Sequence, residues 1–492
     1  MKKLIRLFVL CAFMTCAITL LSVSASAQTY GDLYYSISGG EIVIDDCKTT
    51  VSSVDIPASI DGYPVTKISA RAFESCYSLE SISIPASVDR VGYAAFNRCS
   101  QLKRVNVADL GAWCEIEFED ATANPLYNGG SIYVGGSQVS ALTIPENTVT
   151  IGNYSFYNCK GIKKLVIPQN VKVIGDCAFY GCIGLESASI DEGPSKIGSM
   201  AFLGCISLRE ISIPRGVSSI GESAFEACSL LSSAYLPEGL ESLGVKAFYD
   251  CSSLTRVNIP ASTLTVPEKC FYNCTALREL TIAHGVEGIG ARAFYSCTSL
   301  ETVVLPSTVS TVESEAFRDC ISLSSLNLEY GLKSIGGSAF RDCTSLRRLY
   351  LPESIEEIAE NSFANNMIEI VYYGGDSADW GRMVADRSLF SCGVVYLHKH
   401  SFGDSIVIRE PSTEQEGIRA SYCAECNFRT DELIPRLEKA YEVEIQPPKS
   451  SSRPIINLAA GLAGGSADPI LGLIALIGAI ASIGVCMFAK KN

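Results

Sequence analysis

The sequence predicts a repeat solenoid, because one short pattern recurs along most of the chain at a fixed period. A phenylalanine marks each copy, and ten of the eleven intervals between successive marks are 23 residues long, whereas one is 60. A cysteine follows three residues after each of these phenylalanines except the last, where Asn366 takes its place. The repeated phenylalanines are Phe73, Phe96, Phe156, Phe179, Phe202, Phe225, Phe248, Phe271, Phe294, Phe317, Phe340 and Phe363.

The apolar positions of a regular unit predict which kind of solenoid this is. Leu208, Ile211 and Ile213 fit the L-x-x-L-x-L core of a leucine-rich repeat. Alternation along a short strand directs both isoleucines inward and Ser212 outward, and Pro214 ends the strand because proline has no N–H to donate. We therefore expect 23-residue units with short parallel β-strands on one face and turns, 3-10 or short irregular segments on the other.

The second half of each unit must return along the opposite side. We expect Gly221 to serve a turn, Ala224 to permit close packing and Phe225 to fill the middle of the coil. The strand that ends in proline and the segment Ile-Gly-x-x-Ala-Phe-x-x-Cys together resemble the BspA-like (Treponema-type) family of bacterial leucine-rich repeat surface proteins, over roughly residues 30–397. The resemblance implies the fold and supports a binding role at the cell surface. It does not imply a ligand, because such folds carry many functions.

Both ends of the chain carry membrane-related signals. Residues 1–27 predict a secretory signal peptide, with a basic start, an apolar stretch and a cleavage site after Ala27. Residues 469–489 are uncharged and would form a transmembrane helix about 31 Å long. The lysines of the tail at 490–492 are typical of a cytoplasmic end. We therefore expect an exported single-pass membrane protein with an extracellular N-terminal body.

The region between these signals divides into five parts. A strand, a Gly39-Gly40 turn and a second strand predict a hairpin at the start of the repeats, where a solenoid needs a cap. The predicted parts are an N-terminal cap at 28–55, the repeat array at 56–363, a C-terminal cap at 364–397, a small Cys/His module at 398–446 and a linker at 447–468.

The 60-residue interval corresponds to an irregular, expanded unit at 97–155. Phe118 follows Phe96 by 22 residues, so we interpret the interval as one degenerate repeat followed by an expanded one. Residues 132–136 predict a further hairpin. A tolerated insertion on the rim is one interpretation of the interval, and a binding element is the other, because insertions in repeat arrays often gather on the binding face.

The chain has 21 cysteines, which in an exported protein suggests disulfide bonds. Eleven of them occupy one repeat position, however, and would stack about 4.8 Å apart with parallel Cβ directions that do not suit a disulfide. We therefore predict a ladder of buried, reduced thiols. Its members are Cys76, Cys99, Cys159, Cys182, Cys205, Cys228, Cys251, Cys274, Cys297, Cys320 and Cys343.

The module at 398–446 leaves three interpretations open. His400, Cys423 and Cys426 are candidate zinc ligands, although a fourth ligand is not evident in the sequence. A disulfide between Cys423 and Cys426 is the second interpretation, and neither metal nor disulfide is the third. No cofactor is predicted elsewhere in the chain.

Composition excludes some classes of function. A net charge of −14 argues against nucleic-acid binding, which requires clustered basic residues. The chain has only three histidines, and the repeats contain no paired carboxylates, nucleophile–base set or phosphate-binding loop. We predict no catalytic residues and do not expect an enzyme.

The outward strand positions are the candidate binding face. They are mostly small and polar, with mixed charge and two tyrosines, and a merely solvated face is the alternative interpretation. The candidate residues are Arg104, Lys164, Glu210, Tyr235, Arg256, Glu279, Arg348 and Tyr350.

These observations favour a surface-displayed, adhesin-like binding protein whose partner is an extracellular protein or glycan. The alternative is a structural or self-associating envelope protein without a dedicated ligand, in which homo-association would be the main contact. The sequence does not separate a protein ligand from a glycan.

Overall fold

The structure is a computed structural model, and every residue that it describes belongs to one compact unit within residues 1–437. No described helix has both the length and the apolar character needed to cross a bilayer. The predicted signal peptide, linker and transmembrane segment lie outside the described residues, so their predictions stay open. The described residues are 28–375, 379–381, 393–396, 404–412, 415–422 and 429–436.

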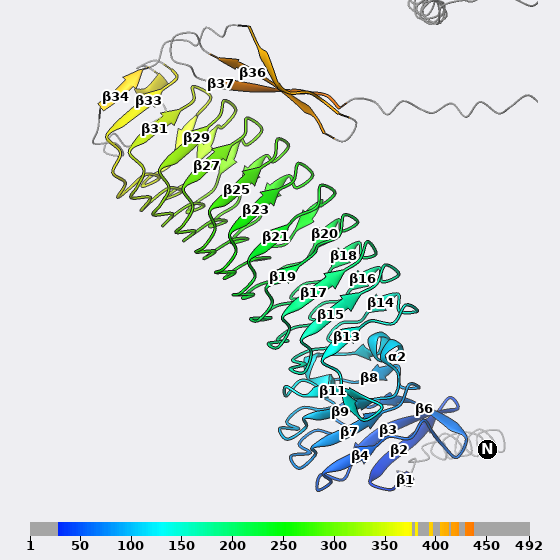
Figure 1. The fold of residues 1–492 in the computed structure, drawn as a ribbon. Helices are drawn as coiled ribbons and strands as arrows, with labels where there is room; N and C mark the ends of the chain where they lie inside the picture. Colours follow the sequence, from blue (N-terminus) through cyan, green and yellow to red (C-terminus); the bar gives the residue numbers. More distant parts are fainter. Residues whose placement is uncertain are drawn as a thin grey trace, which may run out of the picture. The chain divides into compact units, whose positions relative to one another are not determined.

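Each 23-residue unit forms one coil, and at most steps along the array its first strand pairs in parallel with the equivalent strand of the next coil (Figure 1). Leu165 pairs with Ala188, for example, so the register between coils equals the sequence period. The predicted repeat solenoid with parallel strands is therefore confirmed. The strands of this face, called here the strand face, are β4 (Ser53–Asp55), β7 (Ser81–Ile84), β9 (Arg104–Val107), β11 (Ser131–Val134), β13 (Ala141–Thr143), β15 (Lys164–Ile167), β17 (Ser187–Ile190), β19 (Glu210–Ile211), β21 (Ser233–Tyr235), β23 (Arg256–Ile259), β25 (Glu279–Ile282), β27 (Thr302–Leu305), β29 (Ser325–Leu328), β31 (Arg348–Leu351), β33 (Ile370–Tyr373) and β34 (Gly393–Tyr396).

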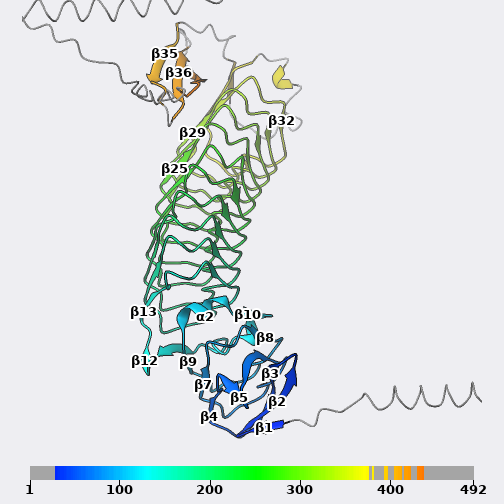
Figure 2. The ribbon, with the colours of Figure 1, turned by 90° about the vertical axis from the view of Figure 1, so that its right-hand side faces the viewer.

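The opposite side of the coils carries a second parallel ladder, which the sequence did not predict (Figure 2). Each strand is two residues long, with the first side chain outward and the second buried in nearly every coil, as at Ser219 and Ile220. Stacking at the 23-residue period aligns these pairs, so backbone hydrogen bonds form where only turns were expected. These strands are β8 (Arg90–Val91), β10 (Glu117–Phe118), β14 (Thr150–Ile151), β16 (Val173–Ile174), β18 (Lys196–Ile197), β20 (Ser219–Ile220), β22 (Ser242–Leu243), β24 (Thr265–Val266), β26 (Gly288–Ile289), β28 (Thr311–Val312), β30 (Ser334–Ile335) and β32 (Glu357–Ile358).

A glycine follows eight of these twelve short strands and permits close approach of neighbouring coils. A Cβ on Gly221 would lie 2.7 Å from both the carbonyl carbon of Gly198 and the Cα of Ser199. Gly221 is absent from the residues with positive φ, so the turn expected of it is not the reason for glycine. The expected turn does follow directly, at residues 222–227, and it is the contact between coils that calls for a glycine.

The phenylalanines and cysteines form the centre of the solenoid. Consecutive rings stack, as between Phe202 and Phe225, whose centroids are 5.4 Å apart and whose planes differ by 6°. Most thiols of the cysteine ladder donate hydrogen bonds to phenylalanine carbonyls of the preceding coil. Cys228 donates to the Phe202 carbonyl at 3.2 Å, for example. Asn366 replaces the thiol in the last unit and donates in the same way to Phe340 at 3.0 Å. This shared hydrogen bond explains why asparagine can replace cysteine at this position.

The N-terminal cap contains the predicted hairpin, in which β2 (Leu33–Ser38) pairs antiparallel with β3 (Glu41–Cys47). β1 (Gln28–Tyr30) extends its outer edge, and β3 continues in parallel into β6 (Tyr63–Ile68), which also pairs with β5 (Ser59–Ile60). The cap therefore joins the ladder on the side opposite the strand face.

The interrupted unit holds a short helix and a hairpin. α2 (Leu110–Glu115) begins after Asp109, whose side chain accepts from Ala112 N. η1 (Ala121–Ala123) follows, and β11 pairs antiparallel with β12 (Ser137–Gln138) as predicted. Phe118 does not take the repeat phenylalanine position, because it pairs with Val91 in the short-strand ladder.

Ala123 takes that position instead. The Phe96 N–H donates to the Thr122 carbonyl at 3.0 Å, as the Phe73 N–H donates to the Ala95 carbonyl at 2.8 Å in the preceding coil. The residue after each acceptor therefore has the same place, and in this coil it is alanine.

Beyond the array, a separate antiparallel sheet comprises β35 (Ile406–Arg409), β36 (Gly417–Tyr422) and β37 (Arg429–Ile434). This three-stranded sheet lies in the sequence of the predicted Cys/His module. His400, Cys423 and Cys426 themselves lie outside the described residues, so their role as metal ligands stays a prediction.

Candidate ligand-binding face

The strand face carries a hollow of about 980 Å³ that crosses the strands from β15 to β25. Five of the eight predicted residues line it, and the other outward strand positions in its lining carry smaller side chains, such as Ser189, Ser212 and Thr281. The five residues are Lys164, Glu210, Tyr235, Arg256 and Glu279. The structure thus gathers these side chains into one concave surface about 24 Å long, taking about 4.8 Å per strand.

Arg104, Arg348 and Tyr350 lie on the strand face but not in this hollow. Arg104 packs over the ring of Tyr133 at 4.0 Å and donates to the Asn106 side chain at 3.0 Å. The hairpin of the interrupted unit therefore holds Arg104 in place, a contact that the repeat pattern could not reveal.

The two predicted tyrosine anchors differ in their surroundings. Tyr350 stacks on Tyr372 of the next strand, with ring centroids 4.7 Å apart, which makes it part of a cross-strand pair. Tyr235 is 62% exposed and stacks on no other ring among the described residues. An exposed aromatic side chain within a hollow is the arrangement that concentrates binding energy, so Tyr235 is the stronger candidate.

Charges along the hollow are mixed and solvated. Arg256 and Glu279 form an ion pair between adjacent strands at 3.4 Å, and their side chains are 66% and 68% exposed. Such exposed pairs contribute little to stability, on the order of 0–1 kcal/mol, so both groups are available to a partner. The surface can therefore offer a partner a positively charged donor and a negatively charged acceptor on adjacent strands.

Fewer residue pairs join the strands in the middle of the hollow than elsewhere along it. β19 and β21 are paired only through Glu210 and Ser233, whereas regular neighbours share up to four residue pairs. On the other side of β21, the Asn258 side chain of β23 donates to the Leu236 carbonyl at 2.8 Å and accepts from its N–H at 3.1 Å. Ser212 lines the hollow outside the ladder, and sequence reasoning missed this feature because the 23-residue period and the proline after each of the two strands continue through it.

Comparison with protein families identifies the repeat. A model described as BspA type leucine rich repeat region matches in six copies, and the matched residues cover more than half of the chain. The chain belongs to the BspA-type leucine-rich repeat family. The matched ranges are 44–112, 133–255 and 264–382. The resemblance drawn from the repeat sequence is therefore confirmed.

Several solved structures are similar to this BspA-type chain. A leucine-rich repeat protein from Bacteroides ovatus is 23% identical, covering 75% of this chain and 99% of its own, with a TM-score of 0.47. A leucine rich cell surface protein from Faecalibacterium prausnitzii is 24% identical, covering 73% and 98%, with a TM-score of 0.45. The T. pallidum leucine rich repeat protein is 21% identical, covering 56% and 91%, with a TM-score of 0.21. No curated protein matches the chain.

Proposed function

We propose that this BspA-type protein is a surface-displayed recognition protein whose strand face binds an extracellular protein or glycan. The observation that carries the proposal is the hollow from β15 to β25, which holds the exposed Tyr235 among short polar side chains. Side chains of this size bring a partner close to the sheet, where serine hydroxyls and the loosened ladder at β19 supply hydrogen-bonding groups.

The contrast between repeated buried positions and variable outward positions along the array supports this proposal. The buried leucine, isoleucine, phenylalanine and cysteine positions repeat with little change because they form the core. The outward positions vary freely, from Lys164 to Glu210 to Arg256, while the strands beneath them keep the 23-residue register. A rigid scaffold with a variable face is typical of repeat proteins that bind extended ligands.

The proposal is tested by screening the purified protein against arrays of extracellular-matrix proteins and glycans, followed by affinity measurement on the ligand found. Tyr235→Ala should weaken that affinity about 30-fold, corresponding to roughly 2 kcal/mol for a hot-spot side chain. Tyr77→Ala is the matched control, since Tyr77 is 55% exposed and lies outside the hollow.

Two outcomes contradict the proposal. If Tyr235→Ala and Tyr77→Ala bind as tightly as the unaltered protein, the ligand does not use the hollow. If no array component binds and the protein associates with itself on a sizing column, the structural alternative is favoured.

A further inference from the structure

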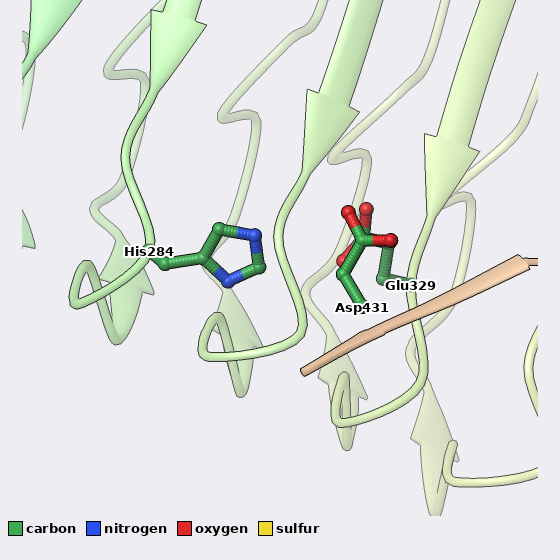
Figure 3. Close-up of side chains that lie close together, drawn as sticks. All are labelled: His284, Glu329 and Asp431. Atoms are coloured by element: carbon green, nitrogen blue, oxygen red, sulfur yellow. The ribbon is translucent and has the colours of Figure 1, made fainter. Parts of the chain in front are cut away.

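Three chemically reactive side chains meet near the last coils, outside the hollow just described. His284 follows β25 and Glu329 follows β29, while Asp431 lies on β37 of the three-stranded sheet. One imidazole nitrogen and one oxygen from each carboxyl group all lie within 4.8 Å of one another. Figure 3 shows the ring of His284 directed toward the two carboxyl groups.

Glu329 is unusual for its place in the repeat. The equivalent position after the strand is proline in most other units, and Glu329 is only 7% exposed there. The Ser307 N–H donates to its Oε2 at 3.0 Å. Burial and the nearby Asp431 carboxylate raise the pKa of Glu329 to about 7. A buried carboxyl group beside a second one is costly unless a cation neutralises them.

His284 offers a nitrogen suited to such a cation. Its Nδ1 is buried and has no hydrogen-bond partner among the described residues. Burial lowers the pKa of His284, which favours the neutral imidazole, the form that binds metal ions. Figure 3 shows Nε2 on the side of the ring that faces the two carboxyl groups, so the neutral imidazole can offer this nitrogen to a cation between them.

Asp431 is held in the orientation that a ligand would need. Its side chain is 5% exposed, and the guanidinium of Arg429 donates two hydrogen bonds to the carboxylate. Nε donates to Oδ1, and Nη2 donates to Oδ2 at 2.6 Å. These two hydrogen bonds use one lone pair on each carboxylate oxygen and leave the second lone pair of each for a metal ion. Partners that fix a metal ligand in this way are common around protein metal sites. Arg409 and Glu416 also line the adjoining hollow of about 450 Å³ and carry opposite charges.

We propose that His284, Glu329 and Asp431 bind a zinc ion. One nitrogen and two carboxylate oxygens, with water as a fourth ligand, make a tetrahedral set that zinc accepts. Zinc bonds of about 2.0–2.2 Å place ligand atoms roughly 3.4 Å apart, so small side-chain rotations close the present spacing. The ion would join β37 to the coils of β25 and β29 and thereby fasten the three-stranded sheet to the array.

The test uses the full chain with Cys423→Ser and Cys426→Ser, which removes both cysteines of the other predicted zinc site and leaves only His400 of it. Zn²⁺ is titrated into this metal-free protein by calorimetry, and thermal unfolding is recorded with and without Zn²⁺. Glu329→Gln and Asp431→Asn keep size and shape, and the glutamine oxygen can still accept from Ser307 N–H. Asp191→Asn is the matched control, because Asp191 is an exposed carboxylate at the same repeat position as Glu329.

We expect one zinc ion per chain and a rise in melting temperature on its addition. Glu329→Gln and Asp431→Asn should each weaken zinc binding at least tenfold and abolish the rise, whereas Asp191→Asn should change neither. The proposal is overturned if the serine background binds no zinc, or if all three variants bind it equally. A melting shift of the same size with Mg²⁺ would overturn zinc as the ion.

Discussion

Substitution of Gly336 by alanine tests how tightly adjacent coils determine the sequence. A Cβ at this position would lie 2.6 Å from both the carbonyl carbon of Glu313 and the backbone N of Ser314. Ordinary contact needs about 3.4 Å or more, so the neighbouring backbone would have to move by roughly 0.8 Å. That backbone is fixed by β28–β30 pairing and by the bond from Gly336 N to Val312 O at 2.7 Å.

The expected cost follows from these contacts. Overpacking costs about 1–3 kcal/mol, and each ladder hydrogen bond lost adds about 1 kcal/mol, giving a destabilisation of about 3 kcal/mol. Gly337 provides an adjacent control, because a Cβ there would lie 3.6 Å from the Glu360 carbonyl oxygen and its φ is not positive. Gly337→Ala should therefore be neutral or stabilise by about 0.4–1 kcal/mol.

Urea unfolding followed by far-UV circular dichroism measures both effects. The two variants should fall on opposite sides of the unaltered midpoint, or Gly337→Ala should coincide with it. Midpoints are the appropriate quantity, since long repeat arrays need not unfold in two states. Equal midpoints for Gly336→Ala and Gly337→Ala would refute the argument that coil-to-coil contact requires glycine.

Two further predictions concern the solenoid core. Phe225→Ala removes a fully buried ring stacked between Phe202 and Phe248, a loss of about 3–5 kcal/mol, so it should lower the urea midpoint at least as far as Gly336→Ala does; an unchanged midpoint would contradict the packing. Burial raises the pKa of the Cys228 thiol to about 12, so iodoacetamide at pH 8.5 should modify Cys228 only after unfolding, and mass spectrometry showing rapid native labelling would contradict this.

The repeat pattern predicts the coil because its information is local and repeated. Leu208, Ile211 and Ile213 specify a strand with one buried side, and the period specifies which residue stacks on which. The second ladder escaped prediction because two residues are too few to show alternation. The role of Gly221 was not predicted either, because the sequence of one unit does not show how closely the next coil approaches it.

The candidate face divides in the same way. Alternation alone shows that Glu210 and Tyr235 point outward, and the structure places both at the surface. Whether an outward residue joins the hollow depends on sheet curvature and on local gaps in pairing. Tyr350 has the same repeat position as Tyr235, yet it packs on Tyr372, because a tyrosine follows on the next strand.

Two units have an acidic residue at the position that is proline in most units, and these two residues differ in the burial of their side chains. Asp191 and Glu329 both stand where other units have proline, and both gain a backbone hydrogen bond to the preceding coil, at 2.9 Å to Ile167 and 3.3 Å to Leu305. The backbone gain is therefore common to both and explains neither side chain. The Asp191 side chain is exposed, as a solvated replacement should be, whereas Glu329 is buried beside Asp431. A sequence comparison of repeat positions could select Glu329 as unusual, but only the path of the chain brings His284 and Asp431 to it. The burial of that carboxyl group, not its presence, is what a bound cation would explain.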